Sequence, residues 1–276
     1  MKIYLTIFII FIICFYIILV IFGEEIQNIA TFPKTWYENI IINWVEKIQL
    51  KNWNNKIVGI YLDNNKEKTI FYFHWNGWNI NMFENQIKNL WNLWYNVLCY
   101  DYPWYGESDG SPTEKSVYEA SEIFYKYLIN EKKISKEDII IYGYSIWAAV
   151  AIDLAYKKDI NNLIVMAPFS SRYWMGKYIL KFNFAKSIFL KNSFVSEEKI
   201  KNLKSRILII HWKEDKLIPF YMWEKIYKNS WAKEKYFISI EKAGHNNISY
   251  QFDKDINPYI INFIEWKEIW KQILIK

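Results

Sequence analysis

The stretch that decides the fold is Asp138–Ala155, which reads DIIIYGYSIWAAVAIDLA. Its apolar run Ile139–Tyr142 predicts a buried strand, and the alanine-rich residues that follow predict a helix. Ser145 stands in the sharp turn between them, where a strained backbone exposes the hydroxyl and the N–H of Ile146 lies at the positive end of the helix. This arrangement suits a nucleophile, but a core strand followed by a serine-capped helix has the same pattern. Residues elsewhere in the chain must decide between the two.

The composition is that of a globular protein. The chain has 276 residues, of which 52% are hydrophobic and 23% charged, enough for one α/β domain that carries an insertion. The net charge of +6 comes from dispersed lysines, so we expect no nucleic-acid partner. Cys14 lies in an apolar run and Cys99 in a predicted core strand, so neither a disulfide nor a cysteine-based metal site is expected.

The N-terminus predicts a membrane anchor. Ile3–Phe22 carries no charged residue and is long enough to cross a bilayer as a helix. A cleaved signal peptide is the alternative, but the apolar run is longer than its usual hydrophobic region and no small-residue cleavage site follows. Lys2 before the run and Glu24 and Glu25 after it favour an extracytoplasmic domain. We therefore expect an anchor at residues 1–23, a juxtamembrane segment at 24–50 and a catalytic domain at 51–276.

Strands alternate with helices along that domain, which predicts a mostly parallel sheet covered by helices on both faces. Ile57–Leu62 and Thr69–His74 are expected to form an entry hairpin across the polar residues 63–66. Residues 169–203 have no strand pattern and are expected to form a small lid. The other expected strands are Asn96–Tyr102, Asn162–Pro168, Arg206–His211 and Lys235–Ile240, and the other expected helices are Asn79–Trp94, Thr113–Asn130, Phe220–Lys228 and Asn257–Ile273.

A nucleophilic serine requires a base and an acid, which should follow later strands of the same sheet. His245 lies in a polar loop after the last long strand, and Asp215 follows the strand before it. Alone, the histidine has no special meaning and the aspartate would be a turn residue. Their order, Ser145, Asp215, His245, is the order of the α/β-hydrolase triad and differs from those of chymotrypsin and subtilisin.

Five motifs in the correct order carry a resemblance to the α/β-hydrolase superfamily. The chain from about Glu46 to Ile273 resembles in particular the small-lid, often membrane-anchored branch akin to serine aminopeptidases and monoacylglycerol lipases. The motifs are the serine turn, residues 74–79 (HWNGWN, similar to HGNxGN), residues 101–110 (DYPWYGESDG, similar to DYPGYGxSxG), the lid-entry strand at 164–171 and the acid loop at 207–219.

The resemblance implies a serine hydrolase that cleaves an ester, thioester or amide through an acyl-enzyme, without a cofactor or a metal. It implies Ser145, Asp215 and His245 as the triad, with the N–H groups of Asn76 and Ile146 as the oxyanion hole. A small, hydrophobic acyl compound would be the substrate, and residues 3–22 would bind the bilayer. The alternative is a catalytically silent α/β-hydrolase fold that acts as a membrane-tethered scaffold.

Several family glycines are tryptophan in this chain. They are Trp75, Trp78, Trp104, Trp147 and Trp212 within the motifs, and by context Trp53, Trp94, Trp223 and Trp231. The chain has only 8 glycines, against about 19 expected from their usual share. Our hypothesis is that the gene uses UGA for glycine and was translated with UGA as tryptophan. If the tryptophans are real, they favour the scaffold, because an indole at Trp147 would press on the turn that aims Ser145.

Overall fold

The computed structural model describes residues 4–14, 25, 28, 31–33, 40–180, 193–245 and 250–275. Within them a nine-stranded sheet has the order β1-β2-β4-β3-β5-β6-β7-β8-β9. Only the β1–β2 and β2–β4 pairs are antiparallel, so the sheet is mostly parallel, as predicted. The strands are β1 (Glu46–Asn52), β2 (Asn55–Leu62), β3 (Thr69–Phe73), β4 (Asn96–Tyr100), β5 (Ile139–Tyr144), β6 (Asn162–Met166), β7 (Arg206–Trp212), β8 (Lys235–Ile240) and β9 (Gln272–Ile275).

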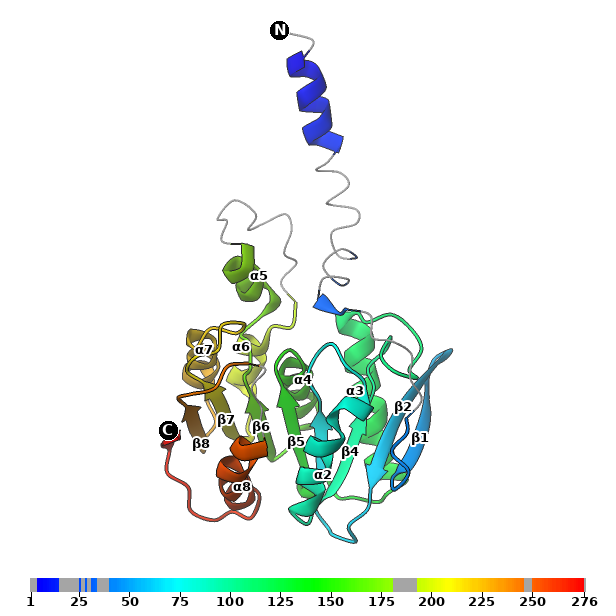
Figure 1. Ribbon diagram of the computed structural model, residues 1–276, viewed down its shortest axis with the longest axis vertical. Helices are drawn as coiled ribbons and strands as arrows, with labels where there is room; N and C mark the ends of the chain where they lie inside the picture. Colours follow the sequence, from blue (N-terminus) through cyan, green and yellow to red (C-terminus); the bar gives the residue numbers. More distant parts are fainter. Residues whose placement is uncertain are drawn as a thin grey trace.

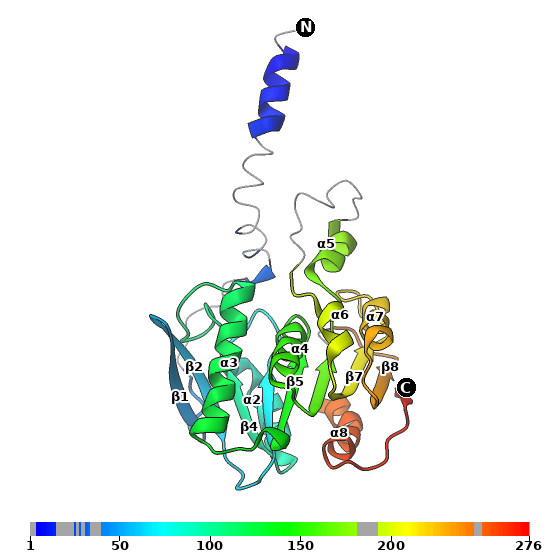
Figure 2. The same ribbon diagram turned by 180° about the vertical axis from the view of Figure 1, so that it is seen from behind.

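Helices cover both faces of the sheet, which the predicted alternation of strands and helices required. Helices α2 and α8 lie on one face (Figure 1), and α3, α4, α6 and α7 lie on the other (Figure 2). Each face has its own apolar core, because both sides of the central strands are buried. The helices are α2 (Glu84–Asn92), α3 (Glu114–Asn130), α4 (Trp147–Lys158), α5 (Arg172–Leu180), α6 (Ser196–Lys199), α7 (Tyr221–Asn229) and α8 (Tyr250–Ile264), with short 3-10 turns at Ile80–Phe83, Lys136–Asp138 and Ile200–Asn202.

The predicted entry hairpin is wrong. Strand β2 pairs with β1 across the two-residue turn Trp53-Asn54, and β3 instead lies between β4 and β5, parallel to both. All five residues of β3 are buried, which suits a central strand better than a hairpin arm at the edge. The sheet thus begins at Glu46, inside the segment expected to be juxtamembrane.

The predicted closing helix is also wrong at its C-terminal end. Helix α8 ends at Ile264, residues 265–271 are not helical, and the chain then forms strand β9 beside β8. Trp266 has φ +55°, and the N–H of Lys267 donates to the carbonyl of Asn262. A left-handed residue just after the last helical turn ends a helix, and glycine is the commonest residue at that position. The helix therefore ends here and the chain changes direction toward β9.

The predicted anchor helix is described only in part. Residues 4–14 are helical and present exposed apolar side chains, whereas residues 15–22 lie outside the described part. Across the described ranges, no helix is both long and apolar enough to cross a membrane. The helix at residues 4–14 lies beyond the domain at the same end as α5 (Figure 1).

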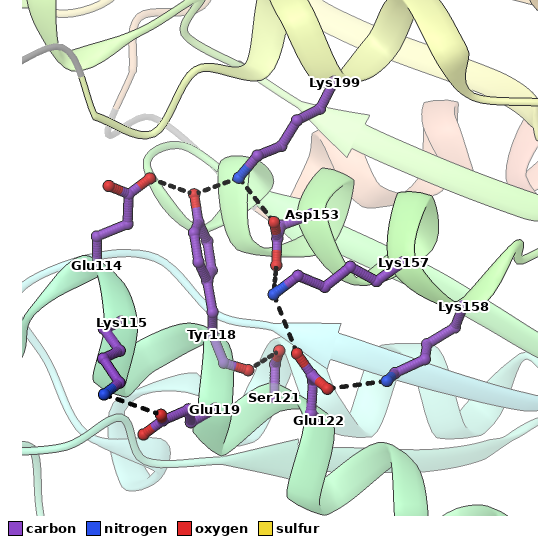
Figure 3. Close-up of polar contacts among 10 residues, drawn as sticks. All are labelled: Glu114, Lys115, Tyr118, Glu119, Ser121, Glu122, Asp153, Lys157, Lys158 and Lys199. Carbon is purple, nitrogen blue, oxygen red and sulfur yellow. Dashed lines mark hydrogen bonds and ion pairs between the residues drawn. The ribbon is translucent and has the colours of Figure 1, made fainter.

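Helix α4, which follows Ser145, is tied to its neighbours by buried charge (Figure 3). Asp153 is almost fully buried and pairs with Lys157 on its own helix at 3.0 Å and with Lys199 of α6 at 2.7 Å. Lys199 also donates to the Tyr118 hydroxyl of α3 at 3.0 Å, and that hydroxyl donates to Glu114 at 2.9 Å. A buried carboxylate is costly without partners, so these contacts fix α3, α4 and α6 relative to one another.

Trp94 occupies the same kind of helix end as Trp266, since it follows α2 with φ +68°. A left-handed backbone costs a residue with a side chain roughly 1–2 kcal/mol, and Trp94 is largely exposed, so little packing offsets that cost. We expect Trp94→Gly to raise the free energy of unfolding by about 1 kcal/mol. Urea denaturation would measure the change. The control is Trp270→Gly, an exposed tryptophan outside the left-handed region, which should not stabilise; equal effects of the two variants would contradict the prediction.

Candidate active site

Ser145 lies directly after β5, at the carboxyl edge of the parallel strands. Its φ is +57°, a left-handed conformation, and its N–H donates to the carbonyl of Met166 on β6 at 2.9 Å. Ile146, with φ −59°, leads into α4, so its N–H lies at the amino end of a helix, where N–H groups have no partner within the helix. The predicted strand, sharp turn and helix are therefore present, with the serine at the apex.

The structure brings the three predicted triad residues together. The Ser145 Oγ lies 2.9 Å from Nε2 of His245, and Nδ1 of His245 lies 2.7 Å from Oδ2 of Asp215. All three side chains are largely buried, and Ser145 is 6% exposed. A proton on Nδ1 donated to Asp215 leaves Nε2 free to accept the serine proton.

The loop after β7 holds the aspartate rigidly. Its Oδ1 accepts the N–H groups of Leu217 at 2.9 Å and Ile218 at 2.7 Å, so the two carboxylate oxygens have separate partners. With Oδ1 occupied by the backbone, Oδ2 is directed at His245.

Tyr144 supports the histidine loop, a contact that sequence analysis missed. Its hydroxyl donates to the carbonyl of His245 at 2.6 Å, and its ring is buried beside those of Trp75 and Trp212. The sequence does not reveal this role, because a tyrosine at the end of an apolar strand is also what a buried core position contains. Tyr144, which precedes Ser145, thus holds the backbone of His245 in place.

His211 is a second residue that the sequence did not single out. It is fully buried at the end of β7, and its Nε2 donates to the carbonyl of Ile218 at 3.0 Å, which closes the loop that carries Asp215. Burial lowers the pKa of His211 to about 4, although the nearby Asp215 acts in the opposite direction. The ring is therefore neutral near pH 7, and it braces the acid loop as a hydrogen-bond donor.

Asn76, the predicted source of an oxyanion N–H, is held by its side chain. Its Oδ1 accepts the Tyr105 hydroxyl at 2.6 Å, and its Nδ2 donates to the carbonyl of Thr31 at 2.7 Å. Gly77 beside it has φ +97°, which a glycine adopts without strain. The main-chain N–H groups of Asn76 and Ile146 remain the predicted oxyanion donors.

Residues 101–110, the second predicted motif, contact the turn that carries Asn76 through His74. His74 is fully buried, its carbonyl accepts the Tyr102 hydroxyl at 2.7 Å, and its Nε2 lies 3.6 Å from Oδ1 of Asp101. Burial raises the pKa of Asp101, which also accepts the N–H of Ile80 at 2.9 Å. A Cβ at Gly106 would lie 2.1 Å from Oδ2 of Asp101, so only glycine fits against this carboxyl.

Three of the tryptophans at the proposed glycine positions have unfavourable surroundings, with an indole N–H unpartnered in the described part of the chain or a very short ring contact. Trp147, Trp212 and Trp223 are buried, and their indole N–H groups have no partner among the described residues. The Trp147 ring lies 3.3 Å from the Tyr102 ring centroid and Trp223 lies 3.5 Å from that of Phe237, closer than aromatic pairs prefer. The ring of Trp212 lies 6.3 Å from that of His245, so this indole borders the site.

Across the described ranges, no group of three or more histidine, cysteine, aspartate or glutamate side chains is placed to hold a metal ion. Cys14 and Cys99 are both free thiols.

The lowered pKa of His211 predicts a loss of stability in acid. A neutral buried histidine stabilises the fold fully above its unfolded pKa of about 6.5, and this contribution is lost as the pH falls toward about 4. In a His211→Gln variant, which keeps an N–H donor, the loss of unfolding free energy between pH 7 and pH 4.5 should be smaller than in the parent by roughly 2–3 kcal/mol. Urea denaturation at the two pH values measures this difference. Equal losses in both proteins would show that His211 is not the titrating group.

Three comparisons with known proteins bear on this architecture. Residues 79–163 match the family model described as Chlamydia CHLPS protein (DUF818). The chain is 29% identical over 185 residues to the alpha/beta hydrolase domain-containing protein aho-3 of Caenorhabditis elegans, covering 67% of this chain and 54% of that protein. It is 31% identical over 153 residues to the human alpha/beta hydrolase domain-containing protein 17B, covering 55% and 51%. The chain thus spans about half the length of these two relatives.

A third relative, an alpha/beta hydrolase of Acanthamoeba polyphaga mimivirus, is 28% identical over 234 residues and is covered to 86%. Among solved structures, a Pyrococcus furiosus esterase superposes with a TM-score of 0.70 at 21% identity, over 86% of this chain and 97% of that one. An alpha-beta hydrolase from Vibrio vulnificus gives 0.68 at 19% identity, over 88% and 92%. These likenesses show that the chain has the α/β-hydrolase fold.

Proposed function

We propose that this protein is a serine hydrolase that cleaves an ester, thioester or amide through an acyl-enzyme. The observation that carries the proposal is the continuous chain of contacts from the Ser145 Oγ through His245 to Asp215, at 2.9 Å and 2.7 Å. A serine that merely capped α4 would need neither a histidine at its hydroxyl nor a carboxylate behind that histidine.

In this mechanism Ser145 attacks the carbonyl carbon of the substrate while Nε2 of His245 accepts the hydroxyl proton. Asp215 holds the Nδ1–H tautomer and stabilises the imidazolium that forms. The protonated histidine then donates to the leaving group, which departs and leaves the acyl group on Ser145. Water, deprotonated by the same histidine, attacks the acyl-enzyme and regenerates the serine.

The negative charge that develops on the carbonyl oxygen would be held by the N–H groups of Asn76 and Ile146. Each such donor is typically worth about 2.7–4 kcal/mol in the transition state. The Ile146 donor is supported by its place at the amino end of α4, and the Asn76 donor by the two side-chain hydrogen bonds that fix its turn.

A small, hydrophobic acyl compound is the proposed substrate. The similar structures include the Pyrococcus furiosus esterase and a monoacylglycerol lipase from Paleococcus ferrophilus, which superposes with a TM-score of 0.60 at 14% identity over 75% of this chain and 98% of that one.

A single-pass N-terminal anchor, with the hydrolase domain outside the cytoplasm, is the proposed location. It is supported by the uncharged run at residues 3–22 and by the exposed apolar side chains of residues 4–14. Such a surface is stable in lipid and unfavourable in water.

We also propose that the tryptophans at family glycine positions are encoded as glycine. Three of the nine, Trp53, Trp94 and Trp104, have φ of +56°, +68° and +83°. Trp147, Trp212 and Trp223 are the buried indoles with unpartnered N–H groups. The codons at these positions in the gene test the proposal directly: UGA supports it, and UGG contradicts it and favours the silent scaffold.

The catalytic proposal predicts covalent labelling of Ser145 by a fluorophosphonate probe. A protein made with glycine at the nine positions should label, and the chain with tryptophan should label at least tenfold more slowly, because the Trp147 indole crowds the turn. Labelling is measured by in-gel fluorescence and located by mass spectrometry, with Ser145→Ala as the unlabelled control. Equal rates would refute the steric argument, and no labelling of either version would leave the silent scaffold as the better account.

The anchor predicts that the full chain stays in the membrane pellet after a wash at alkaline pH. A variant without residues 2–23 should move to the supernatant, because it lacks the apolar run. Immunoblotting of the two fractions measures the distribution. The anchor is refuted if the full chain is released as completely as the variant.

A further inference from the structure

Four described residues between the N-terminal helix and the sheet contact the surroundings of the candidate site. They are Asn28 and residues 31–33, here named the N-terminal strap. Phe32 is 2% exposed although it belongs to no strand or long helix of the domain, and its ring lies 5.5 Å from that of Trp147 and 5.9 Å from that of Phe194. The sequence pattern of residues 24–50 predicts only a juxtamembrane segment here.

The strap contacts the oxyanion turn. The carbonyl of Thr31 accepts Nδ2 of Asn76 at 2.7 Å, which is one of the two hydrogen bonds that fix the Asn76 side chain. Pro33 lies beside Gly77, with its Cγ 3.8 Å from the place that a Cβ on Gly77 would occupy. Neither contact involves a tryptophan, so both are independent of the residues at the proposed glycine positions.

The strap also contacts both roots of the lid. Arg172, the first residue of α5, donates to Oδ1 of Asn28 at 3.1 Å, and its guanidinium lies 5.8 Å from the Phe32 ring. Phe194, where the chain returns toward α6, has its ring 5.9 Å from that of Phe32. The N–H of Arg172 donates to the carbonyl of Ser193 at 3.0 Å, so the two roots are joined beneath the strap.

We propose that the N-terminal strap is a positioning element of the active site. By joining the oxyanion turn to the lid roots, it holds the Asn76 N–H where the developing oxyanion forms. This inference rests on the proposed serine hydrolase activity. It differs from a membrane-tethering role, which would require no contact between the strap and the turn. Asn28 and Phe32 are thus positioning residues, because they act through Asn76 and Arg172.

The test uses the full chain in detergent micelles, in whichever version, tryptophan or nine-glycine, labels faster with the probe. Phe32→Ala removes the ring that joins the roots, and Asn28→Ala removes the acceptor of Arg172. For each we expect kcat for a short-chain p-nitrophenyl ester to fall at least tenfold, with KM changed less than threefold. Asn28→Asp and Phe32→Leu keep the acceptor and the apolar contact, and they should recover most of the rate. Phe8→Ala, on the exposed face of the N-terminal helix, is the matched control and should behave like the parent.

The labelling reaction separates mispositioning from unfolding. Unfolding lowers the final labelled fraction, whereas a misplaced oxyanion donor lowers the rate constant and leaves that fraction unchanged. An active parent whose Phe32→Ala and Asn28→Ala variants keep the parental kcat would overturn the strap proposal alone. A parent that neither labels nor hydrolyses the ester would overturn the proposed function, and the strap proposal with it.

Discussion

The left-handed backbone of Ser145 is the constraint on which the rest of the site depends. A φ of +57° is unfavourable for serine by roughly 1–2 kcal/mol, so contacts around the turn must hold it. The Ser145 N–H is bound to β6, and α4 packs so closely on β5 that a Cβ at Gly143 would lie 2.4 Å from that of Ala151. The buried Asp153 further fixes α4, and the loops of Asp215 and His245 bring their side chains to the Ser145 hydroxyl.

Much of this arrangement could be predicted, because it depends on the order of local patterns. The run Ile139–Tyr142 is buried on both faces, as a continuous apolar stretch implies, and the alternation of such runs with helices leads to a parallel sheet. In a parallel sheet the residues that follow the strands meet at one edge. Ser145, Asp215 and His245 each follow a strand, so their proximity could be expected although 100 residues separate the first from the last.

The remainder depended on long-range packing that no local pattern carries. Strand β1 is mostly polar and β9 is short and half-exposed, so neither has the apolar run of a core strand; each forms because a neighbouring strand offers its free edge. His211 donates a hydrogen bond to the carbonyl of Ile218, and Tyr144 donates one to the carbonyl of His245. Every residue has a backbone carbonyl, so the type of the accepting residue does not indicate such a bond. The contact of Thr31 with Asn76 is hidden for the same reason.

Among the described residues with a left-handed backbone, Ser145 differs physically from three largely exposed tryptophans. At Ser145 the strain is held by the Met166 carbonyl and by buried neighbours, and it directs a hydroxyl at His245. At Trp53 and Trp94 the side chains are 83% and 69% exposed, so little packing offsets the left-handed backbone. Trp266 is 58% exposed, and its ring lies 3.8 Å from the guanidinium of Arg206. Strain that serves a site is compensated by its surroundings, whereas strain at an exposed hairpin turn or helix end is what a glycine would remove. Trp266 was not among the nine positions chosen by family resemblance, so its backbone supports the glycine proposal independently of that resemblance.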